Sequence, residues 1–222
     1  MTHMARELTG FLYPFIESEE RDGSSLLVDL AASAEEKVAQ SRRLRTTTLE
    51  RCASRLAQAG EATAQRFRQG GRLFAFGNGG SATDAEGAVD LFLRPPSGRP
   101  LPAISLVDDR AVLTALANDV GFDLVFSRQV IAHARAGDVA VGFSTSGDSR
   151  NVLRGLEEAS HRGLLTIGLC GYDGGAMAAS DAIAHCLVVH SESVHRVQET
   201  QNALVFQLWS IVQAHLGEGA DA

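Results

Sequence analysis

The chain has 222 residues, of which 45% are hydrophobic and 21% are charged, a composition typical of a folded domain with a substantial core. The formal net charge of -7 disfavours direct binding to nucleic acid, which usually requires a basic surface. No apolar run approaches the roughly 18 residues of a membrane span, and no signal-peptide pattern occurs, so a cytoplasmic protein without membrane contact is expected.

The first part of the chain predicts an irregular extension followed by helices. Residues 1–23 contain a short cluster of apolar residues around Pro14 in an otherwise polar, irregular stretch. From residue 24 to residue 70 no proline occurs, and apolar residues recur at helical spacing. This pattern predicts two amphipathic helices over 24–70, with a break between Arg45 and Thr48.

Residues 71–222 alternate between short apolar runs and helical segments. The apolar runs are Leu73 to Phe76, Ala103 to Leu106, Val139 to Phe143, Leu164 to Leu169 and Ile183 to Val189. Nearly continuous apolar runs are typical of strands buried on both faces of a parallel sheet. The sequence therefore predicts a doubly wound, Rossmann-like α/β domain with five parallel strands and a long C-terminal helix over 193–216. We expect residues 71–222 to form one folding unit with the helices of 24–70.

A glycine-rich loop follows the first predicted strand, in the segment FAFGNGGSATDA at residues 74–85. Its glycines allow a tight turn and the close approach of a ligand, and a helix beginning near Ser81 would direct its positive end at that ligand. The glycine spacing matches neither the P-loop nor the dinucleotide-binding motif. The residues alone leave two interpretations open, a ligand-binding loop and an ordinary strand-to-helix turn.

A second loop, STSGDS at residues 144–149, follows the third predicted strand and precedes a helix. Hydroxyls and backbone N–H groups at the positive end of a helix hold a phosphate without needing a lysine. One such side chain would suffice to cap the helix, so four hydroxyls in six positions favour a phosphate cradle over a plain cap. Because the loops that follow parallel strands meet at one edge of a sheet, both loops are expected to face one pocket.

Several motifs occur in a characteristic order between residues 40 and 216: GNGGS, AND followed by GF, STSGDS, GYDGG and RVQE. In this order they resemble the phosphoheptose isomerase branch of the sugar-isomerase (SIS) domain family, and equally its relative, the DnaA initiator-associating protein. The resemblance implies a Rossmann-like fold, a homotetramer with helices 24–70 in its core, and active sites between subunits. It also implies a sugar phosphate as ligand and, from the DnaA-associating relative, a regulatory protein as a second kind of partner.

The resemblance carries substrate contacts over to matching positions of this chain. The implied contacts to the sugar are Asn78, Gly79, Gly80, Ser81, Asn118, Asp119 and Gln198. The resemblance also implies that the glutamine at the position of Gln198 contacts zinc in the family members that contain the metal. The implied contacts to the phosphate are the hydroxyls of the second loop, Ser144, Thr145, Ser146 and Ser149.

The acid/base residues of phosphoheptose isomerases are absent at the matching positions. Those enzymes carry a His and a Glu on the helix after GNGGS and a second His on the last helix, residues credited with proton transfer and zinc binding. Here the three positions are Gly87, Leu91 and Phe206, which neither take up protons nor bind metals, so no zinc or other cofactor is expected. The candidate replacements are Asp90, next to the lost Glu, and His195, near the matched glutamine, and both also fit ordinary surface residues.

Two functions fit these observations. The favoured one is a phosphosugar-binding protein without isomerase chemistry, because the binding loops are kept while the usual acid/base set is missing. The alternative is an active phosphoheptose (aldose–ketose) isomerase with relocated acid/base residues. The matched contacts Asn118, Asp119 and Gln198 favour this alternative, because a protein that recognised only the phosphate would have less use for them.

Overall fold

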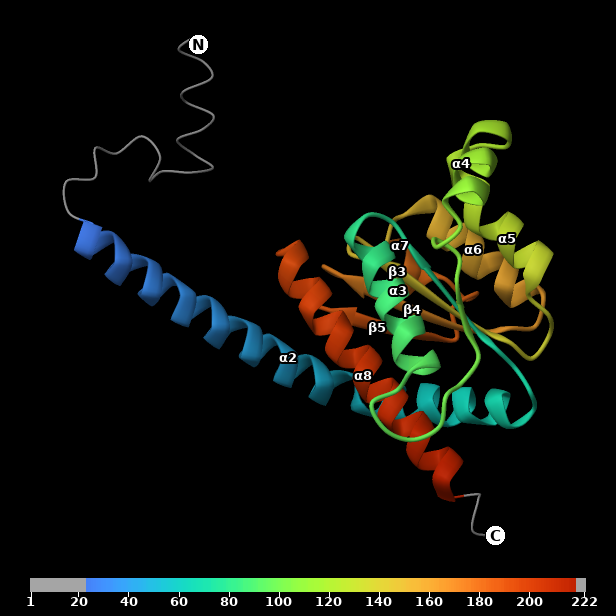
Figure 1. Ribbon diagram of the computed structural model, residues 1–222, viewed down its shortest axis with the longest axis horizontal. Coiled ribbons are helices and arrows are strands. Elements are labelled where there is room, and N and C mark those ends of the chain that lie inside the picture. The colour runs from blue at the N-terminus through green and yellow to red at the C-terminus, as the bar shows by residue number, and fades with distance from the viewer. Residues whose placement is uncertain (1–22, 219–222) are drawn as a thin grey trace. The chain divides into compact units, whose positions relative to one another are not determined.

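The computed structural model describes the backbone of residues 23–218 and the side chains of residues 27–217. The chain divides into two units, residues 1–42 and 43–222, and the second unit holds the sheet (Figure 1). The predicted irregular extension, residues 1–23, lies outside the described residues apart from Gly23. Within the described part, no helix combines the length and the apolar character needed to cross a membrane.

A single long helix, α2 (Gly23–Arg68), replaces the two helices predicted from the sequence. The predicted break between Arg45 and Thr48 is wrong. The Thr47 hydroxyl donates to the backbone carbonyls of Arg43 at 3.0 Å and Leu44 at 3.1 Å, so this polar residue is accommodated inside the helix. Because neither proline nor glycine occurs between residues 24 and 59, nothing in this stretch terminates the helix.

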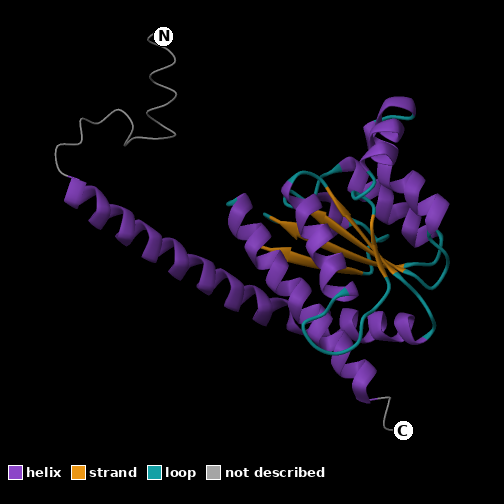
Figure 2. Ribbon diagram, in the orientation of Figure 1, coloured by secondary structure: helices purple, strands orange, loops and turns teal. Residues whose placement is uncertain are grey.

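Five parallel strands form one sheet, as predicted, in the order β2-β1-β3-β4-β5 (Figure 2). Their bounds are β1 (Leu73–Gly77), β2 (Ala103–Ser105), β3 (Val139–Ser144), β4 (Leu165–Gly171) and β5 (His185–Val189). The direction of winding reverses between β1 and β3. In doubly wound folds, the crevice at this reversal point, beyond the carboxyl ends of the strands, is where ligands bind.

Helices cover both faces of the sheet (Figures 1 and 2). One face is covered by the C-terminal part of α2, by α3 (Gly80–Leu93) and by α8 (Val194–Glu218). The other face is covered by α5 (Val125–His133), α6 (Arg150–His161) and α7 (Gly175–Ala179), with α4 (Arg110–Asp119) and the 3-10 helix η1 (Phe122–Leu124) packed beside them. Alternate residues of β1 enter the two resulting cores, which makes the sheet apolar on both sides. The predicted doubly wound α/β fold is confirmed.

Gly142, in the middle of β3, marks a close approach of α6, the helix that follows the second loop. A Cβ at Gly142 would lie 2.8 Å from Leu156 Cδ1 and 2.9 Å from Val152 Cγ1. We expect Gly142→Val to lower the free energy of unfolding by roughly 1–3 kcal/mol, because α6 must move away from the sheet. Urea unfolding measures the effect. A loss no larger than that of Gly87→Ala, whose added Cβ meets no atom within 4 Å, would contradict this packing argument.

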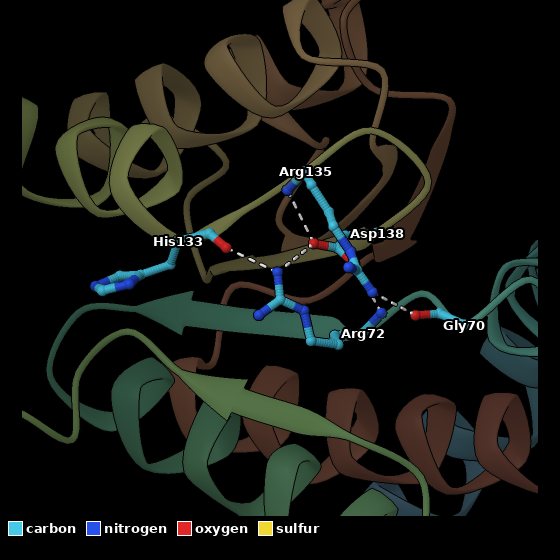
Figure 3. Close-up of polar contacts among 5 residues, drawn as sticks. All are labelled: Gly70, Arg72, His133, Arg135 and Asp138. Atoms are coloured by element: carbon cyan, nitrogen blue, oxygen red, sulfur yellow. Dashed lines mark hydrogen bonds and ion pairs between the residues drawn. The ribbon is translucent and has the colours of Figure 1, made fainter.

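Asp138 joins the amino-terminal ends of β1 and β3 (Figure 3). Its side chain is fully buried and accepts hydrogen bonds from Arg72 N at 2.8 Å, Arg72 Nη2 at 2.9 Å and Arg135 N at 2.9 Å. The two arginines also donate to backbone carbonyls, Arg72 to His133 at 2.7 Å and Arg135 to Gly70 at 2.9 Å. This network lies at the opposite end of the strands from the two predicted ligand loops.

Candidate functional site

The STSGDS loop folds around the hydroxyl of Ser144, which is buried at the end of β3. Ser144 Oγ donates to Ser149 Oγ at 2.9 Å, accepts from Gly147 N at 3.1 Å and lies 3.4 Å from Ser146 Oγ. Ser146 Oγ in turn accepts from Asp148 N at 3.1 Å. Three serine hydroxyls therefore converge in one loop at the carboxyl end of a strand.

Helix capping does not account for Ser149. This residue is the N-cap of α6, yet its side chain makes no capping hydrogen bond. Its hydroxyl accepts the hydrogen bond from Ser144 instead. The positive end of the 12-residue helix α6 thus lies directly behind a cluster of hydroxyl groups, an arrangement suited to a bound anion.

The GYDGG turn, residues 171–175, packs against the second loop and hydrogen-bonds to it. Gly147 has a φ of +75°, and a Cβ there would lie 2.1 Å from the carbonyl oxygen of Gly174, so only glycine fits. Ala176 N donates to Asp148 Oδ1 at 2.8 Å, and Met177 N donates to the carbonyl of Gly147 at 3.0 Å. The turn after β4 therefore holds the shape of the loop after β3.

A reciprocal pair of amides joins the two loops. Asn78 Nδ2 donates to Asn151 Oδ1 at 2.7 Å, and Asn151 Nδ2 donates to Asn78 Oδ1 at 2.8 Å. Asn78 follows β1, and the buried Asn151 is the second residue of α6. The GNGGS and STSGDS loops consequently lie side by side at the reversal point of the sheet. Sequence reasoning missed Asn151, which stands two residues after the second loop.

An open groove of about 360 Å³ lies between α3 and α8, beside the GNGGS loop. Its lining residues are Gly80, Thr83, Asp84, His195, Gln198, Glu199 and Asn202. A Cβ at Gly80 would lie 2.2 Å from Gln198 Nε2, so the first loop and the matched glutamine are in direct contact. The volume is within the range of small-molecule sites.

Asp84 is the buried carboxyl group of this groove, with an exposed fraction of 7%. Its Oδ2 accepts from Gln198 Nε2 at 3.2 Å, and its Oδ1 accepts from Asn202 Nδ2 at 3.1 Å. Burial raises the pKa of Asp84, while the hydrogen bonds from Asn202 and Gln198 lower it by less. Sequence reasoning missed this residue, although its spacing of three from Gly87 places both on one face of α3.

The raised pKa of Asp84 predicts how stability depends on pH. A carboxyl whose pKa is higher in the folded protein contributes its full stability below the unfolded pKa of about 3.9 and loses it as pH rises through the folded pKa. We therefore expect Asp84→Asn to gain stability relative to wild type between about pH 4 and neutral. Urea unfolding across this range measures the difference, with Asp181→Asn at an exposed position as control. Parallel stability curves for Asp84→Asn and wild type would contradict the expectation.

The two catalytic candidates from the sequence lie in different places. Asp90 is exposed and forms an ion pair with Arg94 one turn further along α3. It lines a separate cavity of about 580 Å³ beside β2, together with Ser105 and Arg110. His195 is exposed but lies in the groove near Gln198. The structure thus brings His195, and not Asp90, to the groove.

Asn118 and Asp119 stand apart from the groove within one chain. They end α4, both side chains are exposed, and Asn118 Nδ2 donates to Asp119 Oδ1 at 2.8 Å. In the described part of the chain, no hydrogen bond links either side chain to the two loops.

The positions that the resemblance assigns to zinc do not fit a zinc ion. Of these positions, Gly87, Leu91 and Phe206 carry no donor atom in their side chains, and Gln198 alone keeps one. Phe206 is 51% exposed and packs on Trp209, with ring centroids 5.2 Å apart. Over residues 27–217, no group of three or more His, Cys, Asp or Glu side chains is placed to hold a metal ion.

Known proteins similar to this chain cover most of its length. A family model described as the SIS domain matches residues 38–171. A phosphoheptose isomerase of Chlorobaculum parvum is 42% identical over 186 residues, 82% of this chain and 88% of that protein. One of Pelobacter propionicus is 46% identical over 154 residues, 68% of this chain and 80% of that protein. The solved phosphoheptose isomerase of Neisseria gonorrhoeae matches with a TM-score of 0.77 and 36% identity, over 83% of this chain and 99% of that chain.

These relatives contradict the function favoured in the sequence analysis, a binding protein without isomerase chemistry. Relatives that are 42% and 46% identical, and that this chain matches over most of their length, are named as isomerases. The alternative, an isomerase with relocated acid/base residues, is better supported. The error came from equating the loss of three side chains with the loss of chemistry, while the buried carboxyl of Asp84 was not considered. By its family model, its fold and its relatives, the chain belongs to the SIS domain family, in the branch that contains the phosphoheptose isomerases.

Proposed function

We propose that this protein is a phosphoheptose isomerase that interconverts a ketose phosphate and an aldose phosphate. The observation that carries the proposal is the chain of contacts from the hydroxyl cluster of the second loop, through the Asn78–Asn151 pair and Gly80, to Gln198 and Asp84. A phosphate site is thereby joined to a site with a titratable group. The similarity to proteins named phosphoheptose isomerase supports the choice of substrate.

The phosphate binds in the second loop. The hydroxyls there and the positive end of α6 stabilise its negative charge without a basic side chain. The contacting residues are Ser144, Thr145, Ser146 and Ser149. Thr145 is held in place because its carbonyl accepts a hydrogen bond from Gly171 N at 3.0 Å.

The sugar extends from the phosphate across the first loop into the groove between α3 and α8. Gly79 and Gly80 allow its close approach, and Gln198 contacts it from α8. Asn78 and Ser81 complete the proposed contacts of the loop, as the resemblance implies. His195 at the mouth of the groove is available for a hydrogen bond to a sugar hydroxyl.

A homotetramer is part of the proposal. Four large apolar side chains on the first part of α2 are exposed to solvent, namely Leu27, Val28, Leu30 and Val38. Burial of these side chains against other copies is favourable, and this supports assembly through these helices. An active site formed between subunits would also give Asn118 and Asp119 a sugar to contact, although they stand apart from the groove of their own chain. Light scattering of the full-length protein measures the assembly, and a monomer would contradict it.

The free thiols support a cytoplasmic location. All three cysteines are buried and none forms a disulfide. The sulfur atoms of Cys170 and Cys186 lie 3.4 Å apart as free thiols. Cysteines without disulfide bonds are typical of proteins that work in a reducing compartment.

Turnover of sedoheptulose 7-phosphate, followed by NMR, tests the proposed function. Conversion to an aldose phosphate is the expected result. Calorimetry on the same sample measures binding separately, with the protein unfolded by heat as the control for non-specific effects. Binding without conversion would contradict the proposed isomerase activity and would indicate a non-catalytic binding protein. If neither binding nor conversion is observed, a heptose phosphate is not the ligand.

A further inference from the structure

We propose that Asp84 is the proton-transfer residue of this isomerisation, and that the reaction proceeds without a bound metal ion. The inference rests on the proposed function above. Asp84 and Asp138 are the two buried carboxylates among residues 27–217, and Asp138 lies in the network at the far end of the strands. Asp84 therefore supplies the one buried carboxyl group that lines the groove.

The reaction requires one proton to move between two neighbouring carbons. The carboxylate of Asp84 takes the proton from C1 of the ketose, and the C–H electron pair forms the C1=C2 double bond while the carbonyl π pair moves to O2. The protonated Asp84 then returns the proton to C2, O1 loses its hydroxyl proton and becomes the aldehyde oxygen, and O2 gains one. No oxidant or reductant is needed, and one carboxyl group serves both steps because C1 and C2 are bonded to each other.

The surroundings of Asp84 suit this task. Each carboxylate oxygen is held by one amide, Oδ2 by Gln198 and Oδ1 by Asn202, so both oxygens have defined positions and lone pairs to spare. Asp84 is also largely shielded from bulk water, because it is buried in the wall of the groove. The other titratable groups that line the groove are His195 and Glu199, both on α8 and both exposed.

The groove offers neutral donors in place of a metal. Gly87 and Leu91 stand three and seven residues after Asp84 on the same face of α3, and neither side chain can ligate. Negative charge that develops on the sugar oxygens in the transition state must therefore be stabilised by N–H groups. Gln198 and Asn202 each carry a second amide hydrogen, and amide donors at fixed positions perform this role in other active sites.

Asp84→Asn tests the role of the carboxyl group because it preserves the shape of the side chain. With sedoheptulose 7-phosphate we expect turnover to fall by about 10²–10⁴-fold while affinity, measured by calorimetry, stays within a few-fold of wild type. In heavy water, the wild type should incorporate deuterium at the reacting carbons and the variant should not. Glu61→Gln, which makes the same charge change at an exposed position of α2, is the control. Turnover or deuterium exchange by a folded Asp84→Asn near the wild-type rate would overturn the inference.

Chelation tests the absence of a metal. Elemental analysis of the purified protein should find substoichiometric zinc, and dialysis against EDTA should leave turnover unchanged. Activity that is lost on chelation and restored by zinc would overturn the metal-free part. Failure of the wild type to convert the substrate at all would contradict the proposed function itself. Conversion by wild type and by Asp84→Asn alike would contradict only the assignment of Asp84.

Discussion

Replacing both Ser146 and Ser149 with alanine should weaken the binding of a sugar phosphate by at least about 100-fold. Each hydrogen bond to a charged group contributes about 1.5–3 kcal/mol, so the loss of two amounts to two or more powers of ten in affinity. The effect is concentrated in this loop because no lysine or arginine lies among the residues at 144–149 to hold the phosphate instead. Calorimetry with sedoheptulose 7-phosphate measures the change.

The double variant needs a control because the two serines also shape the loop. Ser146 Oγ accepts from Asp148 N, and Ser149 Oγ accepts from Ser144 Oγ. A second double variant, Ser54→Ala with Ser160→Ala, removes two hydroxyls from α2 and from the far end of α6 and should bind normally. Unfolding temperatures of both variants show whether each is folded. A folded Ser146→Ala, Ser149→Ala protein with unchanged affinity would refute the phosphate site.

Asp138→Ala should lower the free energy of unfolding by about 3–5 kcal/mol, because it removes both the carboxylate partner of the partly buried Arg72 and the acceptor of two backbone N–H groups. The substitution removes the carboxylate acceptor of the Arg72 guanidinium group and of the backbone N–H groups of Arg72 and Arg135 (Figure 3). Arg72 Nη2 keeps its hydrogen bond to the carbonyl of His133, but Arg72 Nε is already buried without a partner, so the loss of the carboxylate adds to an incomplete set of acceptors. The amino-terminal ends of β1 and β3 would lose their link.

Urea unfolding at neutral pH measures this loss, and Asp181→Ala at an exposed position provides the matched control. The exposed variant should change stability by less than about 0.5 kcal/mol. Because the network is at the opposite end of the strands from the loops, folded Asp138→Ala should still bind sugar phosphate. A stability loss equal to that of the control would show that the network contributes little.

The two buried carboxylates of the described chain have different partners, and the partners indicate different roles. Asp138 accepts from a guanidinium and from two backbone N–H groups, which satisfy its charge inside the protein. Asp84 accepts only from two neutral amides, and burial raises its pKa. A carboxyl group that lacks a cationic partner and lines a groove is costly to keep for stability alone, and this favours a role in chemistry.

The sequence alone was sufficient to predict the class of fold, because buried parallel strands and amphipathic helices leave periodic patterns of apolar residues. Each apolar run from Leu73 to Val189 became a strand of the sheet. The ordered motifs likewise identified the family, since the glycines and hydroxyls of two loops occur at short, fixed spacings. The predicted break near Thr47 was wrong because a hydroxyl in a helix can bond to the backbone of the preceding turn, which leaves no mark in the pattern.

Only the tertiary structure decided which side chains meet. Asn78 and Asn151 are 73 residues apart, and Asp84 and Gln198 are 114 residues apart, yet each pair is in hydrogen-bond contact. Asp90 was a candidate because it is next to Leu91, the position of the lost Glu. A shift of one residue turns a side chain about 100° around a helix, and Asp90 lines a different cavity. The sequence by itself determined the fold, the two loops and the family. The packing of α3 against α8 determined which carboxyl group lies in the groove, because a contact between distant segments depends on how the helices pack and not on local spacing.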